Sequence, residues 1–273
     1  MPEWAAFVGL TGFLLTALLG LARLSQGAVR TDGGRMQSVA GRSRADRDPT
    51  IPRFETRQAA AERARLTERL APEDLSTGAL LANVAVTQGL FGVLLVAGAF
   101  YFEIPARAFG VAPAPLSTGL PALAVGVGAG VGFWVGNEAA AAVADGFGVA
   151  FDESLRELLA PDSAGGWVVL LGVVLPVIAV VEELLFRAAA VGVPVAGLGA
   201  PAWAMALVAS VAFALGHGAQ GKAGIVVTGG LGLALAGLFV LTNSLLAVVV
   251  AHYLVNALEL VVHEGLGVDR LWA

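Results

Sequence analysis

The 273-residue chain contains no cysteine, and only 14% of its residues are charged. Without cysteine the chain can form no disulfide framework, no thiolate nucleophile and no cysteine-ligated metal site. Soluble globular proteins have about 25% charged residues, so the low charge content excludes an ordinary water-soluble enzyme and a disordered chain. The net charge of -5 offers no basic surface for phosphate contacts, which excludes a nucleic-acid-binding protein.

The chain is instead rich in apolar residues, which make up 57% of it and give a mean hydropathy of +0.80. A membrane-spanning helix needs about 20 predominantly apolar residues. Runs of this kind predict an all-α fold, a polytopic membrane helix bundle of about seven transmembrane helices. We place the spans near residues 4–23, 78–101, 118–143, 167–191, 202–217, 223–241 and 244–263.

The cationic residues are concentrated in one segment, since 11 of the 16 lie between Arg23 and Arg69. An excess of arginine and lysine marks the cytoplasmic side of a membrane. We therefore expect a first transmembrane helix (1–24), an Arg-rich cytoplasmic loop (25–75) and a membrane helix bundle (76–273). In a cell-membrane protein with seven spans, this arrangement puts the N-terminus outside and the C-terminus in the cytoplasm.

Part of the Arg-rich loop has helical spacing. Glu62, Arg65 and Glu68 follow one another at intervals of three residues within 55–71, and such pairs support an exposed helix. This surface helix either rests on anionic lipid headgroups or is a solvated connection between the first two spans.

Three charged residues fall inside the fourth predicted span, where each costs at least ~2.5–3.5 kcal/mol on insertion scales. Glu183 and Arg187 are four residues apart and share a helix face, so they can neutralise each other and lock helix packing. Glu182 lies about 100° away from Glu183 around the helix and has no partner nearby in the sequence. An unpaired carboxylate inside a membrane is a functional-site candidate.

Two further spans carry polar residues at helical spacing. His217 follows Phe213 by four residues, and Asn256 follows His252 by four. Considered alone, His217 could be an ordinary residue at the membrane interface. The His252–Asn256 pair, considered alone, could be a polar stripe that joins helices. Taken together with Glu182, these residues supply what hydrolysis without a covalent nucleophile needs. Glu and His can position and deprotonate water, and His and Asn can donate hydrogen bonds to an oxyanion.

The joint pattern resembles the CPBP (CAAX protease and bacteriocin-processing) family, also called ABI or Rce-type intramembrane glutamate endopeptidases. The resemblance covers residues 118–263. It rests on three motifs in the same order on successive membrane helices, Glu182-Glu183-x-x-x-Arg187, Phe213-x-x-x-His217 and His252-x-x-x-Asn256.

The resemblance implies a bundle with a water-accessible cavity facing the cytosolic leaflet and a metal-independent endopeptidase without cofactor. It implies that Glu182 and His217 activate the water and that His252 and Asn256 form the oxyanion site. Structural support is implied for Glu183 and Arg187, with Phe213 as a wall of the cavity. The expected partners are the membrane and a peptide or protein substrate. A prenylated substrate is not implied, because nothing in the sequence indicates a prenyl-binding channel.

Two other classes of protein remain open. A zinc hydrolase could use Glu182, His217 and His252 as a His2Glu ligand set, although the sequence lacks the H-E-x-x-H motif. A non-catalytic membrane binding or immunity-type protein could hold a partner's transmembrane segment with the same polar residues.

The span boundaries conflict with the motif in one respect. Glu182 lies roughly 22 Å along the fourth span from its inner end, whereas His217 lies near the inner end of the fifth. If the two act together, the fourth helix must be tilted, it must begin before Gly166, or the predicted span ends must be wrong.

Overall fold

The computed structural model describes residues 1–23, 77–146, 154–218 and 221–268, and every regular element in these ranges is a helix. Six helices are long and apolar enough to cross a membrane, and they agree closely with six of the predicted spans. They are Trp4–Arg23, Thr77–Tyr101, Leu120–Val143, Ala164–Leu198, Gly224–Thr242 and Leu245–Gly265. The remaining predicted span, 202–217, is a shorter apolar helix, Ala202–Gly216. The prediction of a polytopic helical bundle is therefore confirmed.

The fourth long helix contains two π segments. It consists of α7 (Ala164–Val169), the π segment η2 (Leu170–Val174), α8 (Leu175–Glu183), the π segment η3 (Leu184–Gly192) and α9 (Val193–Leu198). The helix ends at Gly199, whose φ of 67° is the left-handed conformation that glycine adopts at helix C-termini. π segments inside α-helices are rare and occur frequently at functional sites.

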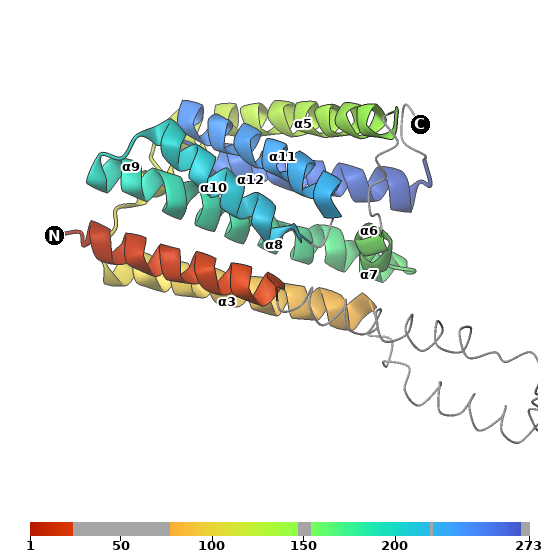
Figure 1. Ribbon diagram of the computed structural model, residues 1–273, viewed down its shortest axis with the longest axis horizontal. Coiled ribbons are helices and arrows are strands. Elements are labelled where there is room, and N and C mark those ends of the chain that lie inside the picture. The colour runs from red at the N-terminus through yellow and green to blue at the C-terminus, as the bar shows by residue number, and fades with distance from the viewer. Residues whose placement is uncertain (24–76, 147–153, 219–220, 269–273) are drawn as a thin grey trace, which may run out of the picture.

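The other major helices pack against this one or against one another. They are α3 (Thr77–Tyr101), α5 (Leu120–Gly146), α10 (Ala202–Gly216), α11 (Gly221–Thr242) and α12 (Leu245–Leu260), which continues into the π segment η5 (Val261–Gly265). The N-terminal helix and α3 form one outer layer, α5 forms the opposite one, and α8, α10, α11 and α12 lie between them (Figure 1). Short helices complete the described chain: η1 (Ala106–Phe109), α4 (Pro115–Thr118) and α6 (Ser154–Leu159).

Close approach of α5 and α12 depends on two glycines. A Cβ at Gly126 would lie 2.7 Å from the Ala247 carbonyl oxygen, and one at Gly130 would lie 2.9 Å from that of Ala251. Small residues of this kind let membrane helices pack backbone to backbone. The contact fixes the part of α12 that carries His252.

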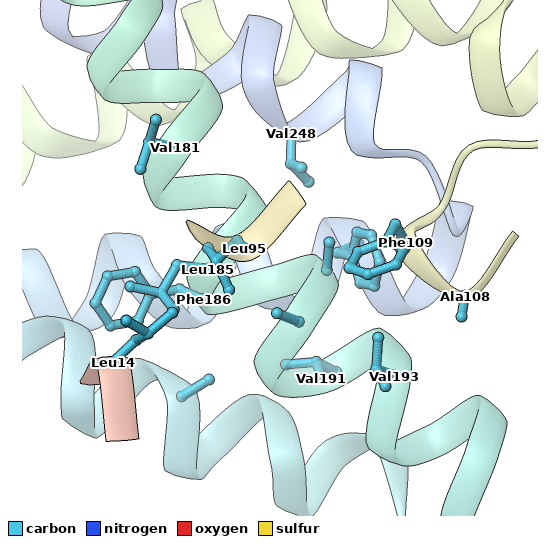
Figure 2. Close-up of a cluster of buried hydrophobic side chains, with 14 of the residues drawn as sticks. Leu14, Leu95, Ala108, Phe109, Val181, Leu185, Phe186, Val191, Val193 and Val248 are labelled. Carbon is cyan, nitrogen blue, oxygen red and sulfur yellow. The ribbon is translucent and has the colours of Figure 1, made fainter. Parts of the chain in front are cut away.

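The apolar core is centred on η3 and the end of α8. Leu185, Phe186 and Val191 lie among side chains from α3, η1, α12 and the N-terminal helix (Figure 2). By contrast, many large apolar side chains on the outside of the bundle are exposed, such as Val93 of α3 and Val208 of α10. An exposed apolar surface around a buried core is what helices in contact with lipid require.

Candidate active site

The helical hairpin formed by α9 and α10 sets the depth of Glu182 and His217. Glu182 lies 16 residues before Leu198 and His217 lies 15 residues after Ala202, on either side of a tight turn. Measured from this turn, the two residues are therefore roughly 24 Å and 22 Å along their helices. The predicted mismatch disappears because α10 is too short to reach the opposite end of the bundle.

Glu183 and Arg187 form the predicted ion pair. Arg187 Nη1 donates to Glu183 Oε1 at 2.8 Å, and both side chains are fully buried. The second guanidinium nitrogen donates to the carbonyl of Gly232 in α11 at 3.1 Å. The guanidinium also lies 4.4 Å from the centre of the Phe213 ring, a cation–π geometry. The arginine thus joins η3, α10 and α11 around one buried charge.

Glu183 also contacts His252, a relationship that the motif spacing did not reveal. His252 Nδ1 donates to Glu183 Oε1 at 2.6 Å, across 69 residues of sequence, and the imidazole is buried. Because the carboxylate accepts this hydrogen bond, Nδ1 carries a proton and Nε2 is the ring nitrogen left for chemistry. Glu183 therefore orients the imidazole in addition to pairing with Arg187.

Glu182 is held from a different helix. Gln88 Nε2 of α3 donates to Glu182 Oε1 at 3.1 Å, and this residue was not among the predicted site residues. Glu182 Oε2 is buried, has no hydrogen-bond partner within the described ranges, and lies 3.8 Å from His252 Nε2. A separation of 3.8 Å is too long for a direct hydrogen bond and suits a bridging water.

Phe213 lies between the two histidines. Its ring centre is 4.5 Å from that of His217 and 6.0 Å from that of His252. Its backbone carbonyl also accepts a hydrogen bond from His217 Nδ1 at 2.8 Å. This bond engages His217 Nδ1, and among the described residues no hydrogen bond engages Nε2 of either imidazole.

Asn256 lies one turn after His252 on α12. Its side chain is half-buried and forms no hydrogen bond with another described residue. An amide donor on the same helix face as His252 is therefore available to a ligand.

An apolar groove borders the Glu182–Gln88 contact. It lies between α3 and α8 with a volume of about 620 Å³, and its walls include Gly89 and Val181, the neighbours in sequence of Gln88 and Glu182. The polar pair is therefore close to a surface open to apolar groups.

The geometry bears on the zinc-hydrolase alternative. Zinc binding would require one ligand atom each from Glu182, His217 and His252 to converge. In the part of the chain that the structure describes, these three atoms do not all lie within 4.8 Å of one another. The side chains would have to rearrange before they could share one ion.

A second, partly buried polar cluster lies outside the motifs and was not predicted. His263 Nε2 of η5 is 3.0 Å from Glu138 Oε1 of α5. Arg156 of α6 pairs with Glu259 at 3.0 Å and with Glu264 at 2.6 Å. These contacts connect α5, α6 and the end of α12 at the end of the bundle opposite the α9–α10 turn. The members are up to 125 residues apart in sequence, so no local spacing could have indicated them.

Comparison with known proteins supports the family resemblance. Residues 164–258 match the family described as Type II CAAX prenyl endopeptidase Rce1-like. This segment contains all three motifs. No curated protein and no solved structure gave a significant match. The apolar helices and this match together indicate a multi-pass membrane protein.

Proposed function

We propose that the protein is a metal-independent intramembrane endopeptidase of the glutamate type, a proposal supported by the match of residues 164–258 to the family described as Type II CAAX prenyl endopeptidase Rce1-like. The observation that carries the proposal is the buried Glu182 carboxylate, whose Oε2 has no hydrogen-bond partner in the described chain and lies 3.8 Å from His252 Nε2. A buried carboxylate oxygen beside a free imidazole nitrogen is a place for a water molecule.

In this mechanism, Glu182 and His217 activate the water. Glu182 Oε2 accepts one proton, and the water oxygen bonds to the carbonyl carbon of the scissile peptide. The proton then passes through His217 Nε2 to the leaving nitrogen as the C–N bond breaks. Water is consumed, and a carboxylate and an amine are produced.

His252 and Asn256 form the oxyanion site. With Nδ1–H engaged by Glu183, His252 donates from Nε2 as an imidazolium that the Glu183 carboxylate stabilises, and Asn256 donates from its amide. Donors fixed in a water-poor site stabilise the charge that develops in the transition state. Glu183 and Arg187 are positioning residues in this scheme, and Phe213 is the wall between the two imidazoles.

The test is single-turnover cleavage of a native peptide by the purified protein in detergent, with a strong chelator present. The peptide would be chosen by comparing membrane peptidomes of cells that carry the wild type or Glu182→Gln. We expect Glu182→Gln to fold, bind the peptide and fail to cleave it, because glutamine keeps the shape and removes the base. The control is Glu103→Gln, which neutralises an exposed glutamate in the loop after α3 and should cleave normally.

Other outcomes favour other functions. Full activity of Glu182→Gln would overturn the glutamate mechanism. Activity lost on chelation and restored by zinc would favour the zinc hydrolase. Peptidomes that do not differ between wild type and Glu182→Gln would favour a non-catalytic binding protein.

A further inference from the structure

Gln88 is a half-buried amide in the middle of a predominantly apolar span. It lies 11 residues after Thr77, the first residue of α3, and therefore roughly 17 Å along that helix. Asn83 and Thr87, on the same helix, are exposed. Polar side chains at this depth are costly unless they have partners inside the bundle. Gln88 has such a partner in Glu182.

The direction of the Gln88 amide follows from the chemistry of that contact. An ionised carboxylate only accepts hydrogen bonds, so the NH2 group of the amide must face Glu182 Oε1, 3.1 Å away. This bond fixes one carboxylate oxygen and leaves Glu182 Oε2 as the oxygen that can act as a base.

The same orientation leaves two acceptors without donors. Gln88 Oε1 and Glu182 Oε2 are both buried, and neither has a hydrogen-bond partner among the residues that the structure describes. They belong to two side chains already joined by a hydrogen bond, and each oxygen is bonded to the same carbon as one of the two hydrogen-bonded atoms. Buried acceptors without donors are satisfied in proteins by internal water, which supplies two O–H donors.

We propose that Gln88 is a positioning residue for hydrolysis, holding Glu182 through its amide N–H and the attacking water through its carbonyl oxygen. This inference rests on the proposed endopeptidase function. One proton of the water goes to Glu182 Oε2, while the other remains on the oxygen and donates to Gln88 Oε1. The lone pair of the water oxygen then points toward the substrate carbonyl carbon, and the Gln88 amide is unchanged at the end of the cycle.

The test replaces Gln88 with methionine, which has similar length and no hydrogen-bonding amide. In single-turnover cleavage with saturating peptide, we expect the rate of Gln88→Met to fall by ~10- to 100-fold, as for a lost hydrogen bond to a charged group. The half-saturating peptide concentration should not change, and the melting temperature should fall modestly because Glu182 Oε1 loses its buried hydrogen-bond donor. The matched control is Asn83→Leu, which removes an exposed amide from the same helix and should cleave at the wild-type rate.

Several outcomes would overturn the role of Gln88. One is an unchanged rate in Gln88→Met while Glu182→Gln is inactive, which would leave the proposed function intact. Another is a higher half-saturating concentration with an unchanged saturating rate, which would indicate substrate contact.

If Gln88→Met melts at a lower temperature than the wild type, the rate is measured well below both melting temperatures. Recovery to the wild-type rate there would show a purely structural role, and a persistent deficit would support positioning. Full activity of Glu182→Gln would overturn the proposed function itself.

Discussion

Glu183 accepts a 2.6 Å hydrogen bond from His252 on the same oxygen that pairs with Arg187. The residue that locks the helix therefore also orients an imidazole of the candidate site. A change at Arg187 is expected to reach His252 through Glu183, although the arginine itself has no contact with His252 among those described.

Arg187→Ala should destabilise the protein by ~3–5 kcal/mol, because it leaves the buried Glu183 carboxylate without its cation. Arg187→Lys should destabilise the protein less, because lysine keeps the positive charge. Some loss of stability should remain, because lysine lacks the planar guanidinium that donates to both Glu183 and the Gly232 carbonyl. Thermal unfolding in detergent would measure both variants. A fully stable but inactive Arg187→Ala would instead place the arginine in the chemistry.

His252→Ala and Asn256→Ala should each keep partial activity. Removal of one oxyanion donor costs ~10²–10³ in rate, whereas removal of the base in Glu182→Gln should abolish cleavage. The measurement is the single-turnover rate at saturating peptide. Tyr253→Phe is the control on the same helix, because its hydroxyl donates to the Leu171 carbonyl and plays no part in the proposed site. Complete loss of activity in Asn256→Ala, with normal folding, would contradict a role limited to one oxyanion donor.

The parts of the fold that the sequence predicted are those governed by local composition. Apolar runs of about 20 residues predicted the membrane helices because chain length and bilayer thickness are directly related. The Glu183–Arg187 pair was predictable because four residues make about one helical turn. The sequence also predicted the short helix α10. It did not predict the depth of His217, because α10 is shorter than a full membrane span.

The unpredicted contacts are tertiary. Gln88 and Glu182 are 94 residues apart, and Glu183 and His252 are 69 apart. No periodicity relates such pairs, and an isolated glutamine in an apolar span gives no indication of its partner. The sequence pattern also did not predict the π winding of η3, because the residues of η3 fit an α-helical face equally well. The predicted helix at 55–71 lies outside the described residues.

The orientation in the membrane remains a prediction that one labelling experiment can test. The chain has no cysteine, so a single introduced thiol reports its own location. Ser38→Cys, in the Arg-rich loop, should be protected from an impermeant thiol reagent in intact cells because that loop is expected in the cytoplasm. Val111→Cys is the control: it is exposed in the connection between α3 and α5 and should react. Labelling of Ser38→Cys with protection of Val111→Cys would reverse the topology.

The close contact between α5 and α12 gives a prediction with a matched pair of glycines on one helix. Gly130→Ala would place a methyl group 2.9 Å from the Ala251 carbonyl oxygen, next to His252. The helices must then separate, and overpacking of this kind costs ~1–3 kcal/mol.

Gly132→Ala is the matched control. Its methyl group meets nothing within 4 Å, and alanine is a better helix former than glycine, so the variant should be neutral or stabilising by up to ~1 kcal/mol. In detergent, the melting temperature of Gly130→Ala should therefore fall, and that of Gly132→Ala should rise or stay unchanged. Cleavage should slow only in Gly130→Ala, because displacement of α12 moves His252 away from Glu183. Equal stability of the two variants would show that α5 and α12 are not in backbone contact at this position.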